Sequence, residues 1–290
     1  MAELEPIGVC ADDYALSPGV TAGIVEAATA GRISATSAMT TRPGWPEAAR
    51  AIAPLSGRVE VGLHLNLTLG APLTGETPLA PDGRLPGART LLLAALGERL
   101  PLAAVQAEVA AQLDAFAAAM GRPPDFVDGH WHVQTLPGVR TALIAELTAR
   151  GLAGQLWLRD SGDSLGHIAA RGRQRGKAAF VAWMGRGFRA EAEAAGFATN
   201  RGFSGFSDFA ATGDYGAEFM SFLTARGSRH LVMCHPGRVD AELAGLDDAT
   251  VSRERELAFL ISDAFPALLR ARGLQLAPLG GAASAARSAG

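Results

Sequence analysis

Lysine is almost absent from this chain, since Lys177 is the only lysine among 26 lysine and arginine residues. The chain is also rich in alanine and glycine, so we attribute the excess of arginine to genomic codon bias rather than to phosphate binding. Positive charge is not in excess either, because the net charge is −3 and the pI is near 6.1. A nucleic-acid-binding surface needs a basic face, so nucleic acid is not an expected partner.

Cysteine, long apolar runs and a leader sequence are lacking as well. Cys10 and Cys234 are too few for a disulfide framework, and we interpret them as small buried hydrophobic residues in strands. No run of about 18 uncharged apolar residues is present, so no integral membrane helix is expected. Met1–Pro6 carries two glutamates, unlike a signal peptide. We therefore expect a cytoplasmic protein.

Hydrophobic residues make up 48% of the chain and fall in short runs that alternate with helix-forming segments. The runs predict strands at Ile7–Ala11, Ile33–Met39, Val59–Leu65, Phe126–Asp128, Gln155–Arg159, His230–Cys234 and Leu274–Pro278. Helices are predicted at Pro18–Ala30, Pro46–Ala53, Leu102–Met120, Pro137–Arg150, Asp214–Arg226 and Ser252–Ser262. This order predicts an α/β fold, an irregular (β/α) barrel with seven or eight parallel strands, similar to a TIM barrel.

No linker or internal repeat divides the chain, so residues 1–279 are predicted to form a single domain. Leu67–Pro101 is rich in glycine and proline, which is typical of a functional loop or lid. Ser161–Arg201 is helical in composition and holds most of the local positive charge. We consider it a candidate surface for a homodimer, although the sequence leaves the oligomeric state open. The tail Gly280–Gly290 is predicted to be disordered.

Residues with metal-binding chemistry fall at the ends of four predicted strands. They are Asp12 with Asp13, His64, the segment Asp128–His132, and His235. In a (β/α) barrel the carboxyl ends of the strands meet on one face, so these side chains are expected to converge. Four of the six histidines of the chain lie at these positions.

Asp12 and Asp13 have two interpretations. They could be a helix N-cap pair, because carboxylates are favoured near the start of a helix. Ser17 followed by proline already provides a helix start, however, which leaves the two aspartates on the connecting loop. One of two adjacent carboxylates can bind a metal ion while the other accepts a proton from water.

The histidines carry similar alternatives. His64 lies in an apolar run, where a buried structural histidine is the common case. His130 and His132 would alternate sides of an extended chain, so they need not bind one ion, and Asp128 could orient a ligand histidine. His235 could be a general acid or a polar turn residue before Pro-Gly. A site with one carboxylate and two imidazoles suits a hydrolytic divalent ion.

Arg171, Arg173, Arg175 and Lys177 form a basic cluster. It could bind an anionic substrate group, but we interpret it as a solvated helix face, which is the common case.

Four segments in order resemble the motifs of the YdjC-like carbohydrate deacetylases, a family that includes chitooligosaccharide deacetylases and enzymes acting on acetylglucosaminyl-hopanoids. These segments are Ala11–Tyr14, Gly62–Leu65 with Thr68–Leu73, Asp128–His132 and Cys234–Gly237. The resemblance implies an irregular (β/α) barrel and removal of N-acetyl groups from an amino sugar or sugar-lipid.

Carried over by position, the resemblance implies that Asp13, His64 and His130 bind one divalent metal ion, with magnesium or zinc foremost. It implies that Asp12 is the general base and His235 the general acid, while His132 is not assigned to the metal. In this mechanism the metal activates water for attack on the acetamide carbonyl and stabilises the oxyanion.

The first motif departs from the family pattern Asn-Ala-Asp-Asp-Phe-Gly. Here Cys10 replaces Asn, Tyr14 replaces Phe and Ala15 replaces Gly. Alanine resists positive φ, so the turn after the aspartates is expected to differ. Two alternatives to a deacetylase remain: a metal-dependent hydrolase of another amide or a phosphoester, and a non-catalytic sugar-binding protein on the same scaffold.

Overall fold

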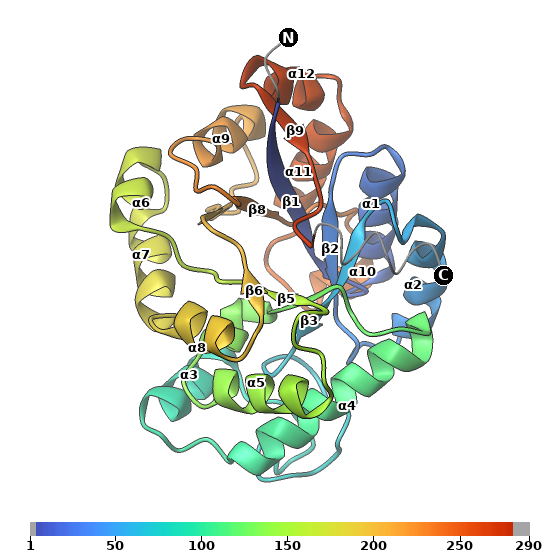
Figure 1. Ribbon diagram of the computed structural model, residues 1–290. Helices are drawn as coiled ribbons and strands as arrows, with labels where there is room; N and C mark the ends of the chain where they lie inside the picture. The colour runs from blue at the N-terminus through green and yellow to red at the C-terminus, as the bar shows by residue number, and fades with distance from the viewer. Residues whose placement is uncertain (1–3, 281–290) are drawn as a thin grey trace.

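The structure is a computed structural model and describes residues 4–280. In these residues parallel strands form one curled sheet (Figure 1). The strands are β1 Glu5–Tyr14, β2 Ala35–Ala38, β3 Glu60–Leu65, β4 Phe126–Gly129, β5 Trp157–Leu158, β6 Ala198–Thr199, β7 Phe203–Ser204, β8 Leu231–Cys234 and β9 Leu274–Leu276. Eight of them follow the order β6-β5-β4-β3-β2-β1-β8-β7, and β9 pairs with the start of β1. Within residues 4–280, the barrel is open between β6 and β7.

The predicted α/β barrel with parallel strands is confirmed, and each of the seven predicted strands is present with adjusted ends. The sequence missed β6 and β7, and the prediction that Ser161–Arg201 is helical was wrong at its end, where β6 lies. Each of these strands has only two residues, which is too short to show a period. The described strands form one continuous sheet, and the single domain over 1–279 stays a prediction. Of the predicted disordered tail Gly280–Gly290, residues 281–290 lie outside the described residues, and the Gly280 N–H donates to Oε1 of Glu60 at 2.7 Å.

The helices follow the strands along the chain and surround the sheet (Figure 1). They are α1 Pro18–Thr29, α2 Trp45–Ile52, α3 Ala88–Leu96, α4 Leu102–Met120, α5 Val139–Ala149, α6 Leu165–Arg171, α7 Arg175–Met184, α8 Phe188–Ala194, α9 Tyr215–Phe222, α10 Ala241–Ala244, α11 Val251–Ile261 and α12 Ala264–Ala271. Leu67–Pro101 was expected to be an irregular loop or lid, and this prediction was wrong where helix α3 lies within the segment. Among the described helices, none is long and apolar enough to cross a membrane.

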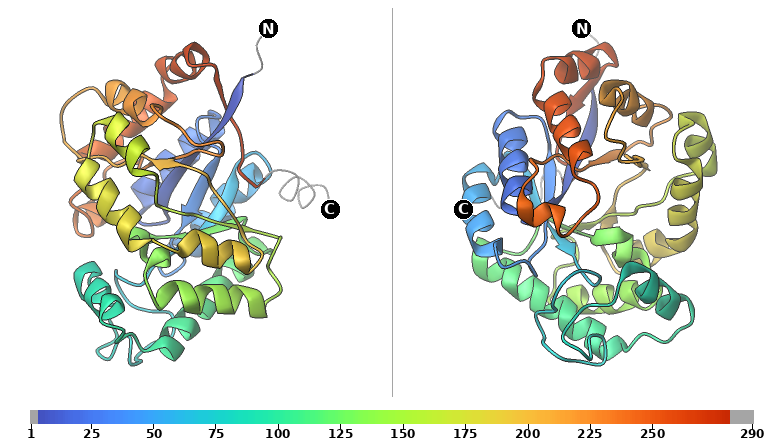
Figure 2. Two further views of the ribbon diagram at one scale, coloured as in Figure 1. Left: turned by 60° about the vertical axis from the view of Figure 1, so that its left-hand side comes forward. Right: turned by 180° about the vertical axis from the view of Figure 1, so that it is seen from behind.

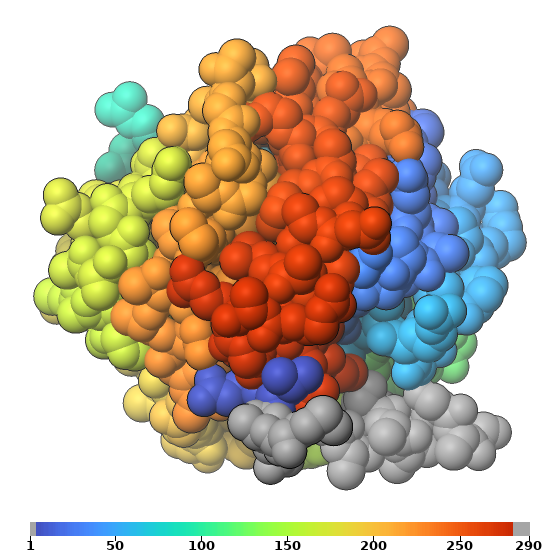
Figure 3. Space-filling view, turned by 90° about the horizontal axis from the view of Figure 1, so that it is seen from above, coloured from blue at the N-terminus to red at the C-terminus, as the bar shows by residue number. Residues whose placement is uncertain are grey.

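The N-terminal helix α1 and the C-terminal helices lie side by side in the helical layer. Viewed from behind, the orange C-terminal helices lie next to the blue α1 (Figure 2, right). From above, the orange and red surface of the C-terminal third borders the blue surface of the N-terminal residues (Figure 3). The Arg238 N–H donates to the Gly19 carbonyl at 3.1 Å, and the Gly237 N–H donates to the Arg253 carbonyl at 3.2 Å. These contacts place α11 beside the carboxyl end of β1.

The limits of α1 arise from local chemistry. Ser17 has an extended backbone, and its hydroxyl accepts a hydrogen bond from the Val20 N–H at 3.3 Å, as expected for an N-cap residue before proline. Gly31 follows the helix with a φ of +67°, the left-handed conformation that ends many helices. Because Ser17 caps the helix, Asp12 and Asp13 are free for another role.

Replacing Gly31 by alanine is expected to lower the free energy of unfolding by about 1 kcal/mol, because only glycine takes the left-handed conformation without steric cost. A Cβ at Gly31 meets nothing within 4 Å, so backbone strain is isolated from packing. Gly166, inside α6, is equally open but helical, and Gly166→Ala is expected to stabilise by about 0.5–1 kcal/mol. Urea unfolding checks both, and a stabilised Gly31→Ala variant would contradict the assigned φ.

Candidate active site

The five predicted site residues line one cavity of about 680 Å³ at the carboxyl ends of the strands. They are Asp12 and Asp13 from β1, His64 from β3, His130 after β4 and His235 after β8. Parallel strands bring these positions together although up to 223 residues separate them in sequence, from Asp12 to His235. The expected convergence is therefore present.

The end of β1 positions the two aspartates. They are part of the strand, so the prediction that they lie on the connecting loop was wrong. The pairing of β1 with β2 shifts register between Ala11 and Tyr14, and Asp13 has a φ of +66°. Such a bulge turns neighbouring side chains in different directions. Ala15 keeps a φ of +70° where the family pattern has glycine, so the turn is retained despite the methyl group.

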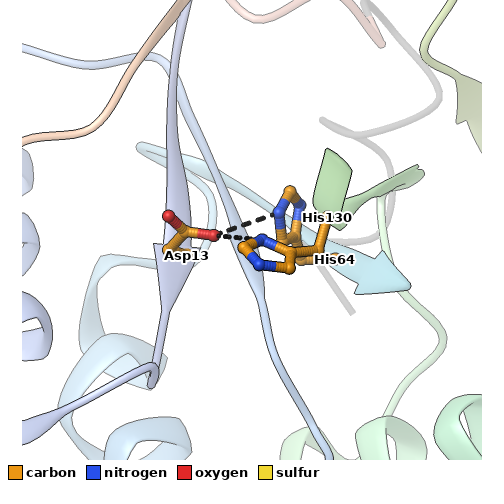
Figure 4. A group of neighbouring side chains, drawn as sticks. All are labelled: Asp13, His64 and His130. Carbon is orange, nitrogen blue, oxygen red and sulfur yellow. Dashed lines mark hydrogen bonds and ion pairs between the residues drawn. The ribbon is translucent and has the colours of Figure 1, made fainter. Parts of the chain in front are cut away.

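Asp13, His64 and His130 face one another (Figure 4). Oδ1 of Asp13 lies 3.2 Å from Nε2 of His64 and 3.0 Å from Nδ1 of His130. One ligand atom from each residue lies within 4.8 Å of the others. Asp13 and His64 are buried, and His130 is half-buried. One carboxylate and two imidazoles at this spacing fit a divalent transition ion with open positions.

His64 is oriented by a second carboxylate. Its Nδ1–H donates to Oδ1 of Asp128 at 2.6 Å, which turns Nε2 toward Asp13. This arrangement matches the expectation that Asp128 orients a ligand histidine, as carboxylates often do beside metals. Burial lowers the pKa of His64, but Asp128 and Asp13 outweigh burial and raise it to about 10. The carboxylates therefore favour a positive charge at this point of the cavity.

Arg159 bridges two buried carboxylates of the site, Asp12 and Asp128. Its two terminal nitrogens donate to the two oxygens of Asp12, both at 2.6 Å, and Nη2 lies 2.5 Å from Oδ2 of Asp128. All three side chains are buried. Burial opposes ionisation of Asp12, but Arg159 outweighs burial and lowers its pKa to about 2. Cys10, Asp12 and Asp128 also lie close together, but this guanidinium already supplies the positive charge there.

Asp13 has an arginine partner of its own. Nη2 of Arg253, on α11, donates to Oδ2 of Asp13 at 2.6 Å and to Asp247 at 2.5 Å. Burial raises the pKa of Asp13, but Arg253 and the two histidines outweigh burial and hold it well below its usual range. Arg253 thus occupies one oxygen of Asp13 and leaves the other directed at the histidines.

His235 is held through its main chain. Its N–H donates to Oε2 of Glu256 at 2.6 Å, and the Tyr215 hydroxyl donates to the same oxygen at 2.9 Å. Among the described residues, Nδ1 of His235 has no hydrogen-bond partner. Burial lowers the pKa of His235 to about 4, although Asp13 and Asp12 oppose this shift. The imidazole is therefore neutral at neutral pH in the resting site.

The two residues after His130, Trp131 and His132, differ in the exposure of their side chains. Both have positive φ, 57° and 59°, inside the 3-10 segment His130–Thr135. Trp131 is 62% exposed, whereas the His132 ring is buried against Phe203 and Phe206. Burial lowers the pKa of His132 to about 3. His132 lines the cavity but does not belong to the converging group of Asp13, His64 and His130.

The two cysteines match their prediction, and the basic cluster matches it only in part. Cys10 and Cys234 are buried and free, as expected, and burial raises the pKa of both thiols. The interpretation of the basic cluster as one solvated face was wrong for two members. Arg171 pairs with Asp163 and donates to the Phe203 carbonyl at 2.8 Å, whereas Lys177 lines the cavity.

The sequence analysis missed Arg159 and Arg253. Arg159 had a usable signal, because a charged residue that ends a predicted parallel strand belongs to the face where the site forms. Arg253 had none, since it is one of many arginines on a helix far along the chain.

Comparisons with known proteins show the family of this chain. A family model described as YdjC-like protein matches residues 6–271. A chitooligosaccharide deacetylase of Klebsiella pneumoniae (strain 342) is 30% identical over 269 residues, 92% of this chain and 95% of that protein. A carbohydrate deacetylase of Mus musculus is 35% identical over 151 residues, 50% of this chain and 47% of that protein. A solved structure from Enterococcus faecalis V583, whose description mentions cellobiose-phosphate cleavage, has a TM-score of 0.71 at 22% identity, covering 96% of this chain and 98% of that one. That last likeness concerns the fold alone.

Proposed function

We propose that this chain, which belongs to the YdjC-like protein family, is a carbohydrate deacetylase that hydrolyses the N-acetyl group of an amino sugar. The observation that carries the proposal is the convergence of Asp13, His64 and His130 inside one cavity, with Asp12 and His235 on its wall. A cavity that combines a cation-binding group with proton-transfer residues is the arrangement that amide hydrolysis requires.

The donor set fits one divalent ion, and Asp13, His64 and His130 are the residues that would hold it. Two imidazoles favour zinc or a similar ion over magnesium, although magnesium stays a candidate because mixed sites accept several ions. Such an ion, when bound, supplies Lewis-acid polarisation of the acetamide carbonyl. The hydrogen bond from His64 to Asp128 and the ion pair of Asp13 with Arg253 would keep the ligands oriented.

Asp12 and His235 are proposed to move the protons. Asp12 is ionised at neutral pH, and its bidentate pair with Arg159 fixes the plane of a carboxylate that lines the cavity. In this position it accepts a proton from the attacking water as a general base. His235 is the proposed general acid that protonates the departing amine nitrogen. Because its lowered pKa leaves the imidazole neutral in the resting site, His235 would take up a proton from solvent after the substrate binds and pass it to the amine nitrogen as the C–N bond breaks.

The cavity is large enough for a sugar unit and has both polar and apolar walls. Leu92, Trp131, Phe180 and Met184 are among its apolar lining residues. An exposed indole such as Trp131 offers an apolar surface with a polar edge, which suits a sugar ring. The apolar wall would also accommodate the lipid of a sugar-lipid, so both substrate types belong in the test. We further propose a cytoplasmic location, in keeping with two free cysteines.

The test is acetate release from N-acetylglucosamine oligomers and an acetylated glycolipid, with and without divalent metal, for wild type, His130→Ala and Asp12→Asn. A deacetylase releases acetate only with metal, His130→Ala loses both metal and activity, and Asp12→Asn keeps metal but loses about 10²–10⁴-fold in rate. Phosphoesters and other amides are assayed beside the sugars. Turnover of those alone would favour another hydrolase, and sugar binding that Asp12→Asn leaves intact, without any turnover, would favour a binding protein.

A further inference from the structure

His235 has no side-chain hydrogen bond that fixes its ring. Catalytic imidazoles are commonly oriented by a carboxylate on one ring nitrogen. In the described part of this chain, Nδ1 of His235 is buried without such a partner, and Glu256 holds only the main-chain N–H. The orientation of the ring must therefore come from packing.

Phe209 supplies that packing. Its ring centroid lies 5.1 Å from that of His235, with an interplanar angle of 76°, and both residues line the active-site cavity. Edge-to-face ring pairs have a preferred geometry, so a fixed Phe209 restricts the rotation of the imidazole.

The backbone of Phe209 is held in an unusual conformation. Its φ is +57°, which is rare for a bulky residue and marks a position that its surroundings force. Ser207 Oγ accepts the Phe209 N–H at 3.0 Å, and Asp208 Oδ1 accepts the Ala210 N–H at 3.0 Å. Arg255, on α11, donates to the Ala210 carbonyl from the other side. Local hydrogen bonds thus fix the turn around Phe209, and Arg255 attaches the loop between β7 and α9 to α11.

Lys177 holds the ring from α7. Its Nζ lies over the Phe209 ring, 4.8 Å from the centroid, a cation–π contact. The side chain is half-buried, and no ion pair engages it in residues 4–280. The only lysine of the chain therefore supports an aromatic ring in the cavity rather than a carboxylate.

We infer that Phe209, supported by Lys177, is a positioning residue that sets the orientation of the His235 imidazole. The inference rests on the proposed role of His235 as the general acid. Phe209 acts through His235 and does not itself transfer a proton.

A double-mutant cycle tests this inference on the metal-loaded enzyme. Phe209→Leu is expected to lower kcat for acetate release about tenfold, with KM changed less than about twofold, because misorientation affects the proton-transfer step. His235→Gln is expected to lower kcat about 10²–10⁴-fold. The double variant should be no slower than His235→Gln alone, since Phe209 has nothing left to orient.

Phe209→Tyr, which keeps the ring, should restore most of the rate, and Lys177→Met should give a smaller loss that Lys177→Arg reverses. Independent, multiplying effects or a change in KM alone would overturn the inference.

A second measurement does not depend on activity. NOEs from the His235 ring protons, which are assigned by their loss in His235→Gln, to side chains other than residue 209 report the orientation of the imidazole. In Phe209→Leu these NOEs are expected to change, because the imidazole is then free to rotate. Phe180→Leu is the control, since Phe180 lines the same cavity and its ring pairs with Trp183. A wild type that releases no acetate would defeat the proposed function, while the NOEs still decide the inference: changed NOEs support it, and unchanged NOEs overturn it.

Discussion

Asp13→Asn is expected to remove the bound divalent ion and lower the rate of acetate release by roughly a thousandfold or more, because a metal Lewis acid contributes several kcal/mol and about 1.4 kcal/mol is tenfold in rate. Asp13 is the one carboxylate among the three proposed ligands, and its Oδ1 lies within 3.2 Å of both histidines. Asparagine keeps the shape but cannot carry the negative charge that a cation requires. Elemental analysis and an acetate assay on the same sample measure both effects.

The matched control is Asp248→Asn, which makes the same change at an exposed position of the same cavity. It should keep its metal, and its rate should stay within a few-fold of wild type, since surface substitutions usually have small effects. A fully metal-loaded and active Asp13→Asn enzyme would rule out the proposed ligand set.

Arg159→Met is expected to lower the free energy of unfolding by about 3–5 kcal/mol, because removing one member of a buried ion pair leaves a buried charge without compensation. Here two carboxylates, Asp12 and Asp128, lose the same partner. Urea unfolding at pH 7 measures the loss. Arg201→Met is the control: its pair with Glu193 is also 2.6 Å long, but the arginine is 49% exposed, so the expected loss is below about 1 kcal/mol.

The pH dependence of this loss has a definite sign. The folded pKa of Asp12 is about 2, below the ordinary value of 3.8. Its ionised form therefore stabilises the fold above pH 3.8, and that contribution is lost as the pH falls toward 2. In Arg159→Met the main cause that lowers the pKa of Asp12 is removed, and burial, opposed only by His64 and His235, raises it, so protonation relieves the unpaired charge. The difference in the free energy of unfolding between wild type and Arg159→Met should therefore narrow as the pH falls below about 5. A gap that is constant with pH would show that lost packing, not charge, causes the destabilisation.

Much of the site was predictable because its residues lie at local landmarks. Asp12, Asp13, His64 and His235 each follow or end an apolar run, and parallel strands carry such ends to one face. The role of Asp128 beside a histidine was also foreseeable, but its partner is His64, 64 residues away, and not its neighbours in the motif. Sequence proximity therefore gave the right residue and left its partner open.

Local patterns thus determined the order of strands and helices, the Ser17 and Gly31 limits of the first helix, and the polar residues at the strand ends, because hydrophobic period and capping chemistry act over a few residues. Only the tertiary structure decided which charges meet. Arg159 reaches Asp12 across 147 positions and Arg253 reaches Asp13 across 240. The end of a predicted strand marks Arg159 as facing the site but does not identify its partners, and nothing in an arginine-rich sequence distinguishes Arg253 from the arginines on the surface. The short strands β6 and β7 were decided in the same way, since two residues become a strand only when a neighbouring strand is there to pair with them.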